Sequence, residues 1–486
     1  MNQIPDWLTM RSQLSPDRLA LTNGQESWSF AQLDRIVSQL AQKLSRLAIH
    51  EGDRVAVMAE STMEMAAIIH ALARLGAVVA PINPRFLPAD QEAMLHDAAP
   101  SLLIATSHDQ TAFPHVIATD TLWHDLASEE TYPPTMIDLS RVQCLMYTSG
   151  TTGRPKGALI SYGNIYYSAI FSAIHNGTIP SDLWLHVMPL FHIGGLSILF
   201  RSVITGSGIV LFPRFDVDQV WDGMSRYPVS LLSLVPTMLH RLMHAKSSFP
   251  ASVRLILLGG APASPSLIDQ ALAAKLPVVQ TYGLTETSSQ IATQQIPVHG
   301  SPKNAGYPIY PTDVAILSKN QVTHDTHDIG EIVVKGPTIF QGYWKNPQKT
   351  REVFWNDWFR TGDIGFLDDT GYLHVIDRKK DLIIRGGENI SPTEIENAFT
   401  THPLILDAGV IAEENREWGQ VPVIMLVSTA PLSRQECLKW AETHLSSIKR
   451  PVRYYSADSL PRTASGKLRR PALWQRWNNG AYREIL

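Results

Sequence analysis

Cysteine is nearly absent from this chain of 486 residues, which contains only Cys144 and Cys437, far apart in the sequence. Two thiols cannot supply a disulfide framework or a four-thiolate zinc site. Unpaired cysteines are most stable in a reducing compartment. A chain of this length buries most of its surface on folding, so we expect a core that needs no covalent or metal staple.

A long apolar run and an export signal are also missing. Pro5 and Asp6 stand where a signal peptide would need an apolar segment. The longest apolar stretch, residues 65–82, is interrupted by His70 and Arg74 and falls short of the roughly 20 residues that cross a bilayer. We therefore expect a cytoplasmic protein without a membrane span.

Neither sign of charge dominates, because 41 basic and 45 acidic residues leave a formal charge of -4. This balance gives no reason to expect nucleic acid as a partner. A local excess of positive charge follows Ser446, where the chain has nine basic residues and two acidic ones, Asp458 and Glu484. This basic tail is either a solvated face or a surface for a phosphate-bearing ligand, and it lacks the interleaved aromatics of nucleic-acid sites. The nine residues are Lys449, Arg450, Arg453, Arg462, Lys467, Arg469, Arg470, Arg476 and Arg483.

Hydrophobic periodicity predicts an α/β architecture. Apolar residues recur with the helical period over residues 30–47 and again over 64–75, and a short β-rich run at 54–58 lies between them. Such alternation is typical of parallel sheets with helices on both faces. From about Asp328 the strands become short and alternating, as in an antiparallel or barrel-like sheet, and a small α+β unit follows. We place the boundary in a charged turn, so that residues 1–379 and 380–486 form two domains.

A hydroxyl- and glycine-rich loop carries the strongest chemical signal. Residues 148–157 (TSGTTGRPKG) directly follow the apolar run VQCLMY, and a helix is predicted from Ser161. Backbone N–H groups and hydroxyls of such a loop can converge on phosphate oxygens, and Lys156 adds a positive charge. The Walker A pattern does not fit, because Pro155 occupies the position that requires glycine.

This loop is the first of eight motifs that follow the order found in the adenylate-forming enzymes, a family that includes acyl-CoA and aryl-CoA synthetases, luciferases and peptide-synthetase adenylation domains. The chain resembles that family over nearly its whole length. The resemblance implies a large N-terminal domain of packed sheets and helices, joined by a hinge to a small mobile α+β C-terminal domain. The other motifs are PLFHIGG (189–195), LLGGAP (257–262), QTYGLTET (280–287), GYWKNP (342–347), WFRTGDIG (358–365), DRKKDLIIRGGENISPTEIE (377–396) and PRTASGK (461–467).

The resemblance also implies a reaction in two steps, with ATP, Mg²⁺ and coenzyme A as cofactors and co-substrates. A carboxylate first attacks the α-phosphate of ATP, giving an acyl-adenylate and pyrophosphate, and the thiol of coenzyme A then displaces AMP. The barrier of the first step lies in bringing two anions together, since the carboxylate is already ionised at neutral pH. Lys467 matches the family lysine that reaches the α-phosphate and the carboxylate. Considered alone, it would be an ordinary surface lysine.

Further roles follow from the same matches. Glu286 matches the acid associated with magnesium, Asp363 and Arg378 would hold the ribose, and Tyr282 would stack on adenine. Lys380 would be the hinge, since it lies two residues after the matched arginine. Without their motifs, Glu286 would be interpreted as a capping or surface acid and Asp363 as a turn residue. The remaining residues expected to bind the nucleotide are Thr148, Ser149, Gly150, Thr151, Thr152, Gly153, Lys156, Gly259, Gly260, Ala261, Pro262, Thr281, Gly283 and Thr285.

The acyl substrate is predicted from PLFHIGG and the segment that follows it. His192 matches a gate residue at the acyl pocket, where Gly260 would also lie. Arg201 closes the apolar run LSILFR, and a buried guanidinium needs an anion, which a second carboxylate on the substrate would provide. The alternative is a helix-end arginine that reaches solvent.

The sequence thus predicts an AMP-forming acid–thiol ligase that acts on a small carboxylic acid, ATP and coenzyme A. Two alternatives are another aryl- or acyl-CoA ligase and an enzyme that loads a carrier protein. A non-catalytic nucleotide-binding module is disfavoured, because the catalytic and nucleotide-binding positions are all filled by matching residues. Assembly into homo-oligomers stays open.

Overall fold

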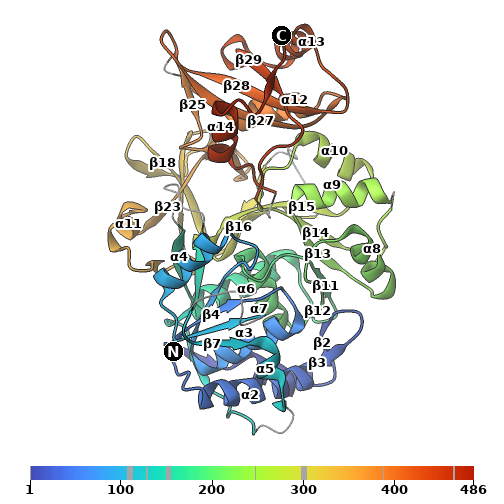
Figure 1. The fold of residues 1–486 in the computed structure, drawn as a ribbon, viewed down its shortest axis with the longest axis vertical. Coiled ribbons are helices and arrows are strands. Elements are labelled where there is room, and N and C mark those ends of the chain that lie inside the picture. Colours follow the sequence, from blue (N-terminus) through green and yellow to red (C-terminus); the bar gives the residue numbers. More distant parts are fainter. Residues whose placement is uncertain are drawn as a thin grey trace.

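The computed structural model describes residues 2–106, 113–126, 130–148, 155–246, 248–296, 304–386, 388–463 and 466–486. Two large sheets organise the first two thirds of the chain (Figure 1). The first has seven strands, of which β4, β5 and β6 pair in parallel and β9 and β10 pair antiparallel. Its strands, in order, are β21 (Gly342–Tyr343), β10 (Lys156–Ser161), β9 (Val142–Thr148), β5 (Val78–Pro81), β4 (Arg54–Met58), β6 (Leu102–Ala105) and β7 (Val116–Ala118).

The second sheet has nine strands and a parallel centre. Its order is β17 (Tyr307–Pro308), β16 (Ser289–Thr293), β15 (Val278–Leu284), β14 (Leu255–Leu258), β13 (Leu231–Leu234), β11 (Leu183–His186), β12 (Gly208–Leu211), β2 (Leu19–Thr22) and β3 (Ser27–Ser29). A two-stranded ribbon, β1 (Gln3–Pro5) with β8 (Met136–Asp138), lies apart from both.

Helices fill the space between these sheets and cover their outer faces. The largest apolar core joins side chains of both sheets to the helices between them, which are α1 (Trp7–Leu14), α2 (Phe30–Arg46), α3 (Met63–Leu75), α6 (Tyr162–Asn176) and α7 (Ile193–Thr205). The nine-stranded sheet is covered outside by α8 (Val217–Arg226), α9 (Pro236–Ala245) and α10 (Pro265–Ala273). The seven-stranded sheet is covered outside by α4 (Pro88–Ala98), and α5 (Thr119–Trp123) packs beside α2.

A third, antiparallel sheet follows, and its inner face packs against β16 of the nine-stranded sheet in a small core. It contains β19 (Gln321–Thr323), β18 (Asp313–Ser318), β20 (Gly330–Lys335), β22 (Phe354–Trp355), β23 (Trp358–Leu367) and β24 (Leu373–Arg378), with α11 (Pro347–Glu352) at its edge. We call everything up to β24 the large lobe.

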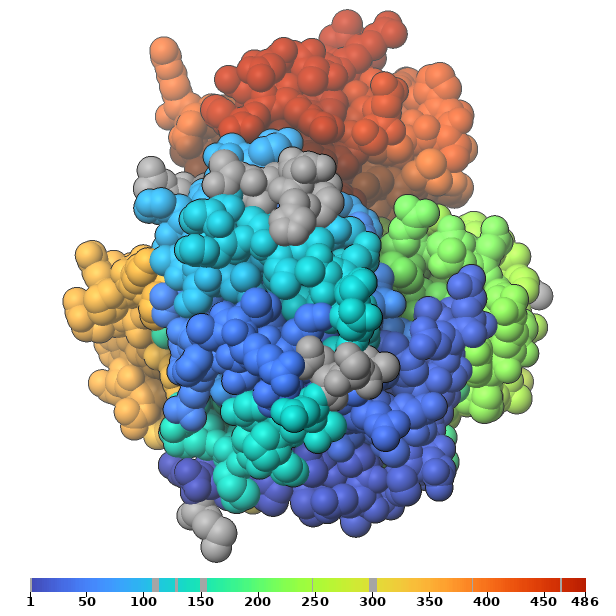
Figure 2. All heavy atoms as spheres, turned by 60° about the horizontal axis from the view of Figure 1, so that its bottom comes forward, coloured from blue at the N-terminus to red at the C-terminus, as the bar shows by residue number. Residues whose placement is uncertain are grey.

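The small lobe begins at β25 and has its own sheet and cores (Figure 1, orange to red). Its strands are β26 (Glu388–Ile390), β25 (Ile383–Arg385), β27 (Ile405–Asn415), β28 (Gly419–Ser428), β29 (Arg453–Ser456) and β30 (Arg483–Glu484). Its helices are α12 (Pro392–Thr400), α13 (Arg434–His444), the short η4 (Ser447–Lys449) and α14 (Arg470–Asn478). Figure 2 shows this lobe at one end of the large lobe.

The α/β architecture with a smaller α+β unit at the end of the chain agrees with the sequence prediction. Two local features differ from the prediction. The helix starts at Tyr162 with Ser161 as its N-cap, as expected, but a strand that was not predicted, β10, lies between the hydroxyl-rich loop and this helix and pairs antiparallel with β9. The antiparallel sheet begins at Asp313 and not near Asp328, since the apolar run of β18 pairs with β20.

Much of the charge on the basic tail is balanced inside the small lobe. Four of its nine basic residues form ion pairs with acids that come earlier in the chain, which reduces the net field of this surface. The pairs are Lys449 with Glu394, Arg453 with Glu413, Arg462 with Asp407 and Arg470 with Glu396. Within the described ranges, no helix is both long enough and apolar enough to cross a membrane.

Candidate active site

The carboxyl ends of the central strands of the nine-stranded sheet bring several predicted residues to one edge. Gly259 follows β14 directly, and a Cβ there would lie 2.7 Å from the Thr281 Cγ2 atom. Gly260 has φ +78°, and a Cβ would lie 3.2 Å from Val235 Cγ1 at the end of β13. Only glycine permits this close approach, so the segment Gly259–Pro262 lies flat against its neighbours. Ligands of parallel sheets bind at such strand ends.

Tyr282, Asp363 and Arg378 form a hydrogen-bonded group beside this edge. The Tyr282 hydroxyl donates to Asp363 Oδ2 at 2.6 Å, and Arg378 Nε lies 3.0 Å from Asp363 Oδ1. Asp363 and Arg378 are directly opposite each other in the β23–β24 pair. Burial and the neighbouring Asp363 raise the pKa of Tyr282 well above its usual value, so its hydroxyl stays a donor. The group presents a buried carboxylate flanked by a ring and a guanidinium.

A second group lies around Glu286, in the short helix η3 (Thr285–Thr287) that follows Gly283 in β15. Tyr343 of β21 donates its hydroxyl to Glu286 Oε1 at 2.8 Å, and the Lys156 ammonium lies 5.9 Å from the centre of the Tyr343 ring. Burial, reinforced by Lys349, lowers the pKa of Lys156. Tyr343 is not among the residues predicted from the sequence, although its place in the motif GYWKNP could have indicated it.

The loop that signalled phosphate binding lies only partly within the described residues. Thr148 and Lys156, at its two ends, are register partners in the β9–β10 pair. Ser149, Gly150, Thr151, Thr152 and Gly153 lie outside the described residues. Both ends of the loop therefore lie together, and the Lys156 end is close to Tyr343, which bonds to Glu286.

Lys467 of the small lobe lies against the large lobe. The neighbouring Gly466 has φ +78°, and a Cβ there would lie 3.0 Å from Thr237 Oγ1 in α9. Burial first, and then the charge of Arg378, lower the pKa of Lys467 to about 8, while Asp363 opposes the shift. The positive charge of Lys380 lowers the pKa of both Lys467 and Lys156. The structure therefore brings Lys467, Lys380, Asp363 and Arg378 into one region.

The Thr281 hydroxyl, in a residue expected to bind the nucleotide, is hydrogen-bonded within the protein. Its Oγ1 atom is 2.8 Å from Thr293 Oγ1 and accepts a hydrogen bond from Gln290 Nε2 at 3.0 Å. The side chain is thus engaged within the β15–β16 pair.

His192 and Arg201 lie on the same helix, α7. His192 occupies the N-cap position of α7, whose preceding loop starts at the carboxyl end of β11, and burial lowers its pKa. Arg201 lies nine residues further, about 13 Å along the helix axis at about 1.5 Å per residue. His192 therefore lies at the end of α7 near the strand ends, and Arg201 lies deeper along the helix.

Arg201 is a buried arginine in the middle of the fold. The residue is 1% exposed, and neither Nε nor Nη2 has a hydrogen-bond partner. The guanidinium carbon lies 5.6 Å from the centre of the Trp184 ring, and burial lowers the pKa of Arg201 to about 10. The alternative of a helix-end arginine that reaches solvent is therefore wrong. A buried cation whose donors are unused is suited to an anionic ligand.

Among the described residues, no group of three or more His, Cys, Asp and Glu side chains could hold a metal ion. A lone carboxylate such as Glu286 still fits Mg²⁺, because this ion keeps several waters and is usually held by one or two carboxylates together with substrate phosphates.

This geometry brings together the strand pair β9–β10, the carboxylate of Asp363 with Tyr282 and Arg378, and Lys467 from the small lobe. The chain belongs to the AMP-binding enzyme family, whose profile matches residues 8–344, and the profile of the AMP-binding enzyme C-terminal domain matches residues 394–467. It is similar to the 2-succinylbenzoate–CoA ligase of Bacillus subtilis (strain 168), with 38% identity over 479 residues, 97% of this chain and 98% of the relative.

The chain is also similar in fold and in sequence to solved structures of o-succinylbenzoate CoA synthetase. The o-succinylbenzoate CoA synthetase from Bacillus subtilis in complex with the acyl-adenylate intermediate OSB-AMP has a TM-score of 0.91 and 36% identity, covering 97% of this chain and 98% of that one. The same enzyme in complex with ATP and magnesium ion has a TM-score of 0.89 and 36% identity, covering 97% of this chain and 100% of that one.

Proposed function

We propose that this protein is an AMP-forming 2-succinylbenzoate–CoA ligase of menaquinone biosynthesis. The observation that carries the choice of acid is the buried Arg201 guanidinium with unused donors. 2-Succinylbenzoate has two carboxylates, so one can be activated while the other pairs with Arg201. The similarity over nearly the whole chain to ligases of this name supports the same choice.

The first half-reaction joins the acid to AMP. A carboxylate oxygen attacks the α-phosphorus of ATP, the new P–O bond forms, and the bond to the bridging oxygen breaks with release of pyrophosphate. Lys467 would place its ammonium between the carboxylate and the α-phosphate, where it reduces the repulsion of two anions and stabilises charge on the phosphoryl oxygens. Lys467 is partly buried, which reduces the competition of water for that contact.

The nucleotide would lie along the strand ends. Asp363 is an acceptor-only group and suits the two ribose hydroxyls, while Arg378 would bind from the other side. Tyr282 and the segment Gly259–Pro262 would enclose the adenine, with Gly283 beside them. This arrangement would leave the triphosphate directed toward the ends of β9 and β10.

At the phosphate end, the hydroxyl-rich loop and Lys156 would hold the β- and γ-phosphates. Glu286 would hold Mg²⁺ together with phosphate oxygens, with Thr285 beside it in η3, and the hydrogen bond from the Tyr343 hydroxyl orients the Glu286 carboxylate. The ion supplies charge neutralisation on the triphosphate when bound. The ammonium of Lys156 adds to the same field.

In the second half-reaction the thiol of coenzyme A attacks the acyl carbon of the adenylate. A C–S bond forms, the C–O bond to AMP breaks, the electron pair leaves with AMP and the thiol proton is released. His192 would act as the gate that separates the acyl group from the thiol path, and Gly260 would leave room beside it.

Between the two steps the small lobe would turn about Lys380, dividing the chain into domains 1–379 and 380–486. The contacts on each side of Lys380 support this division. The Lys379 N–H donates to Gly362 O of the large lobe at 2.9 Å, and Arg470 of the small lobe lies 3.6 Å from Asp381. A cytoplasmic location completes the proposal, since both cysteines are free and buried thiols.

The test is pyrophosphate release with a panel of acids, with and without coenzyme A. We expect 2-succinylbenzoate to give a higher kcat/KM than benzoate, 4-coumarate and medium-chain fatty acids. A higher value for a monocarboxylate would overturn the choice of acid. Turnover that requires a carrier protein and ignores free coenzyme A would favour the carrier-loading alternative.

A further inference from the structure

Asp377 connects the two lobes across the hinge. It belongs to β24 of the large lobe, where it is the register partner of Ile364 in β23. Its Oδ2 atom accepts hydrogen bonds from Ser391 Oγ at 2.7 Å and from the Thr393 N–H at 3.0 Å, and both donors belong to the small lobe. The residue is 8% exposed, so water competes little for these bonds.

The first turn of α12 shows why this contact matters. The first N–H groups of a helix have no partner within the helix. Pro392, at the first position, has no N–H, and the Glu394 N–H donates to the N-cap Ser391 Oγ at 3.2 Å. The Thr393 N–H in between is satisfied by Asp377, whose negative charge also suits a helix N-terminus. One helix cap of the small lobe is therefore supplied by the large lobe.

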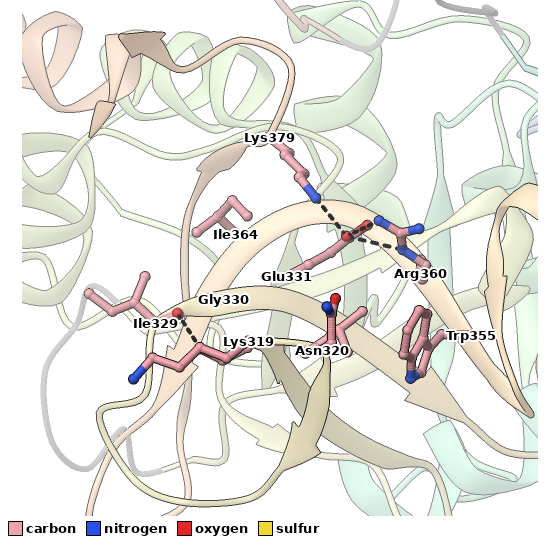
Figure 3. A pocket seen from close by; sticks show the side chains of 11 residues that line it. Lys319, Asn320, Ile329, Gly330, Glu331, Trp355, Arg360, Ile364 and Lys379 are labelled. Carbon is pink, nitrogen blue, oxygen red and sulfur yellow. Dashed lines mark hydrogen bonds and ion pairs between the residues drawn. The ribbon is translucent and has the colours of Figure 1, made fainter. Parts of the chain in front are cut away.

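The chain on either side of Lys380 is fixed to opposite lobes. Lys379 donates from its ammonium to Glu331 at 3.2 Å, and Figure 3 shows Glu331 between Lys379 and Arg360. Asp381 lies beside Arg470, which also binds Glu396 in α12. A turn at Lys380 would carry Ser391 and Thr393 away from Asp377, because β24 stays in the ladder of the large lobe.

We infer that Asp377 is a positioning residue for the first half-reaction, which holds the small lobe where Lys467 reaches the Asp363 region and must release α12 before the second half-reaction. This inference rests on the proposed two-step function. Asp377 acts through the orientation of the lobe and does not touch the reacting atoms.

The test compares the two half-reactions in the Asp377→Asn variant of the full-length protein. In wild type, Asp377 Oδ1 also accepts from the Arg378 N–H at 2.7 Å. Asparagine has one acceptor oxygen and no charge, so it cannot keep this bond together with the bonds from Ser391 and Thr393, and it loses the attraction to the N-terminus of α12. Loss of a helix cap shifts an equilibrium by roughly tenfold, so we expect single-turnover pyrophosphate release to fall by about threefold to tenfold. Conversion of supplied acyl-adenylate and coenzyme A to thioester should stay within about twofold of wild type, because the released arrangement is favoured.

The matched control is Ser433→Ala, which removes the N-cap of α13 within the small lobe, where Ser433 Oγ accepts from the Glu436 N–H at 3.3 Å. This variant should leave the ratio of the two rates unchanged. Equal losses of both half-reactions in Asp377→Asn, or no change in either, would overturn the inference. Wild-type protein that releases no pyrophosphate with any acid would instead contradict the proposed function.

Discussion

Replacing Arg201 with methionine should separate activity from stability. If the guanidinium is reserved for a substrate carboxylate, the folded protein without substrate carries the penalty of an unpaired buried charge. An apolar side chain of similar volume removes that penalty, and such exchanges are neutral or stabilising by about 1–4 kcal/mol. The lost contact with the Trp184 ring, 5.6 Å away, offsets about 0.5–2 kcal/mol of this gain. We expect the Tm of Arg201→Met to be equal to or higher than that of wild type.

The effect on the reaction has the opposite sign. One or two charge-assisted hydrogen bonds to a carboxylate contribute about 1.5–3 kcal/mol each, and removing one partner of a buried pair costs about 3–5 kcal/mol. At about 1.4 kcal/mol per factor of ten, kcat/KM for 2-succinylbenzoate should fall by about a hundredfold to a thousandfold. For benzoate, which has no second carboxylate, the change should be less than about threefold.

The assay measures pyrophosphate release with both acids and thermal unfolding with and without 2-succinylbenzoate. The acid should raise the Tm of wild type and leave that of Arg201→Met unchanged. A variant that unfolds earlier and loses activity toward both acids in parallel would refute the reasoning, since Arg201 would then be a structural residue.

Three further outcomes test the lobe contact and the nucleotide site. Because burial and Arg378 lower the pKa of Lys467 to about 8 in the protein without ligands, and the ammonium is the form that acts, kcat/KM for adenylation should decline above about pH 8. The unfolded chain binds more protons between that pH and the usual lysine pKa of about 10.4, so the contribution of this group to stability should rise over the same interval, as urea titrations would show. Asp363→Ala should weaken ATP binding by about tenfold to a hundredfold in calorimetry, since a buried acceptor of two hydrogen bonds is lost, while the affinity for the acid alone stays unchanged. Gly466→Ala places a methyl group 3.0 Å from Thr237 Oγ1 and should slow adenylation, whereas Gly480→Ala, at a similar φ of +72° with no atom within 4 Å, should not. Equal rates in the two glycine variants would contradict close docking of the Lys467 segment.

The sequence predicted the α/β class and several of its helices and strands, such as residues 30–47, 54–58 and 64–75, because periodicity and turn residues are local signals. It also predicted Tyr282, Asp363 and Arg378 as site residues. Each was recognised from its own motif, so the long stretches of chain between the three did not matter. The structure places Asp363 and Arg378 in adjacent strands, with Tyr282 bonded to the same carboxylate.

Contacts between distant segments could not be predicted. Tyr343 and Glu286 are 57 residues apart, and neither motif indicates that the phenol bonds to the carboxylate. The burial of Arg201 was also undecided, because an apolar run that ends in arginine fits both a buried helix and one whose end meets solvent. Only the packing of α7 against both sheets distinguishes the two.

The position of Lys467 near the end of the chain has a consequence for protein synthesis. Domains fold as units during translation, starting with the N-terminal one. The strand ends that would hold ATP are complete before the small lobe has been made. A nascent large lobe would therefore bind ATP without reacting with it. Adenylation would become possible only after the ribosome has added the segment of the small lobe that contains Lys467.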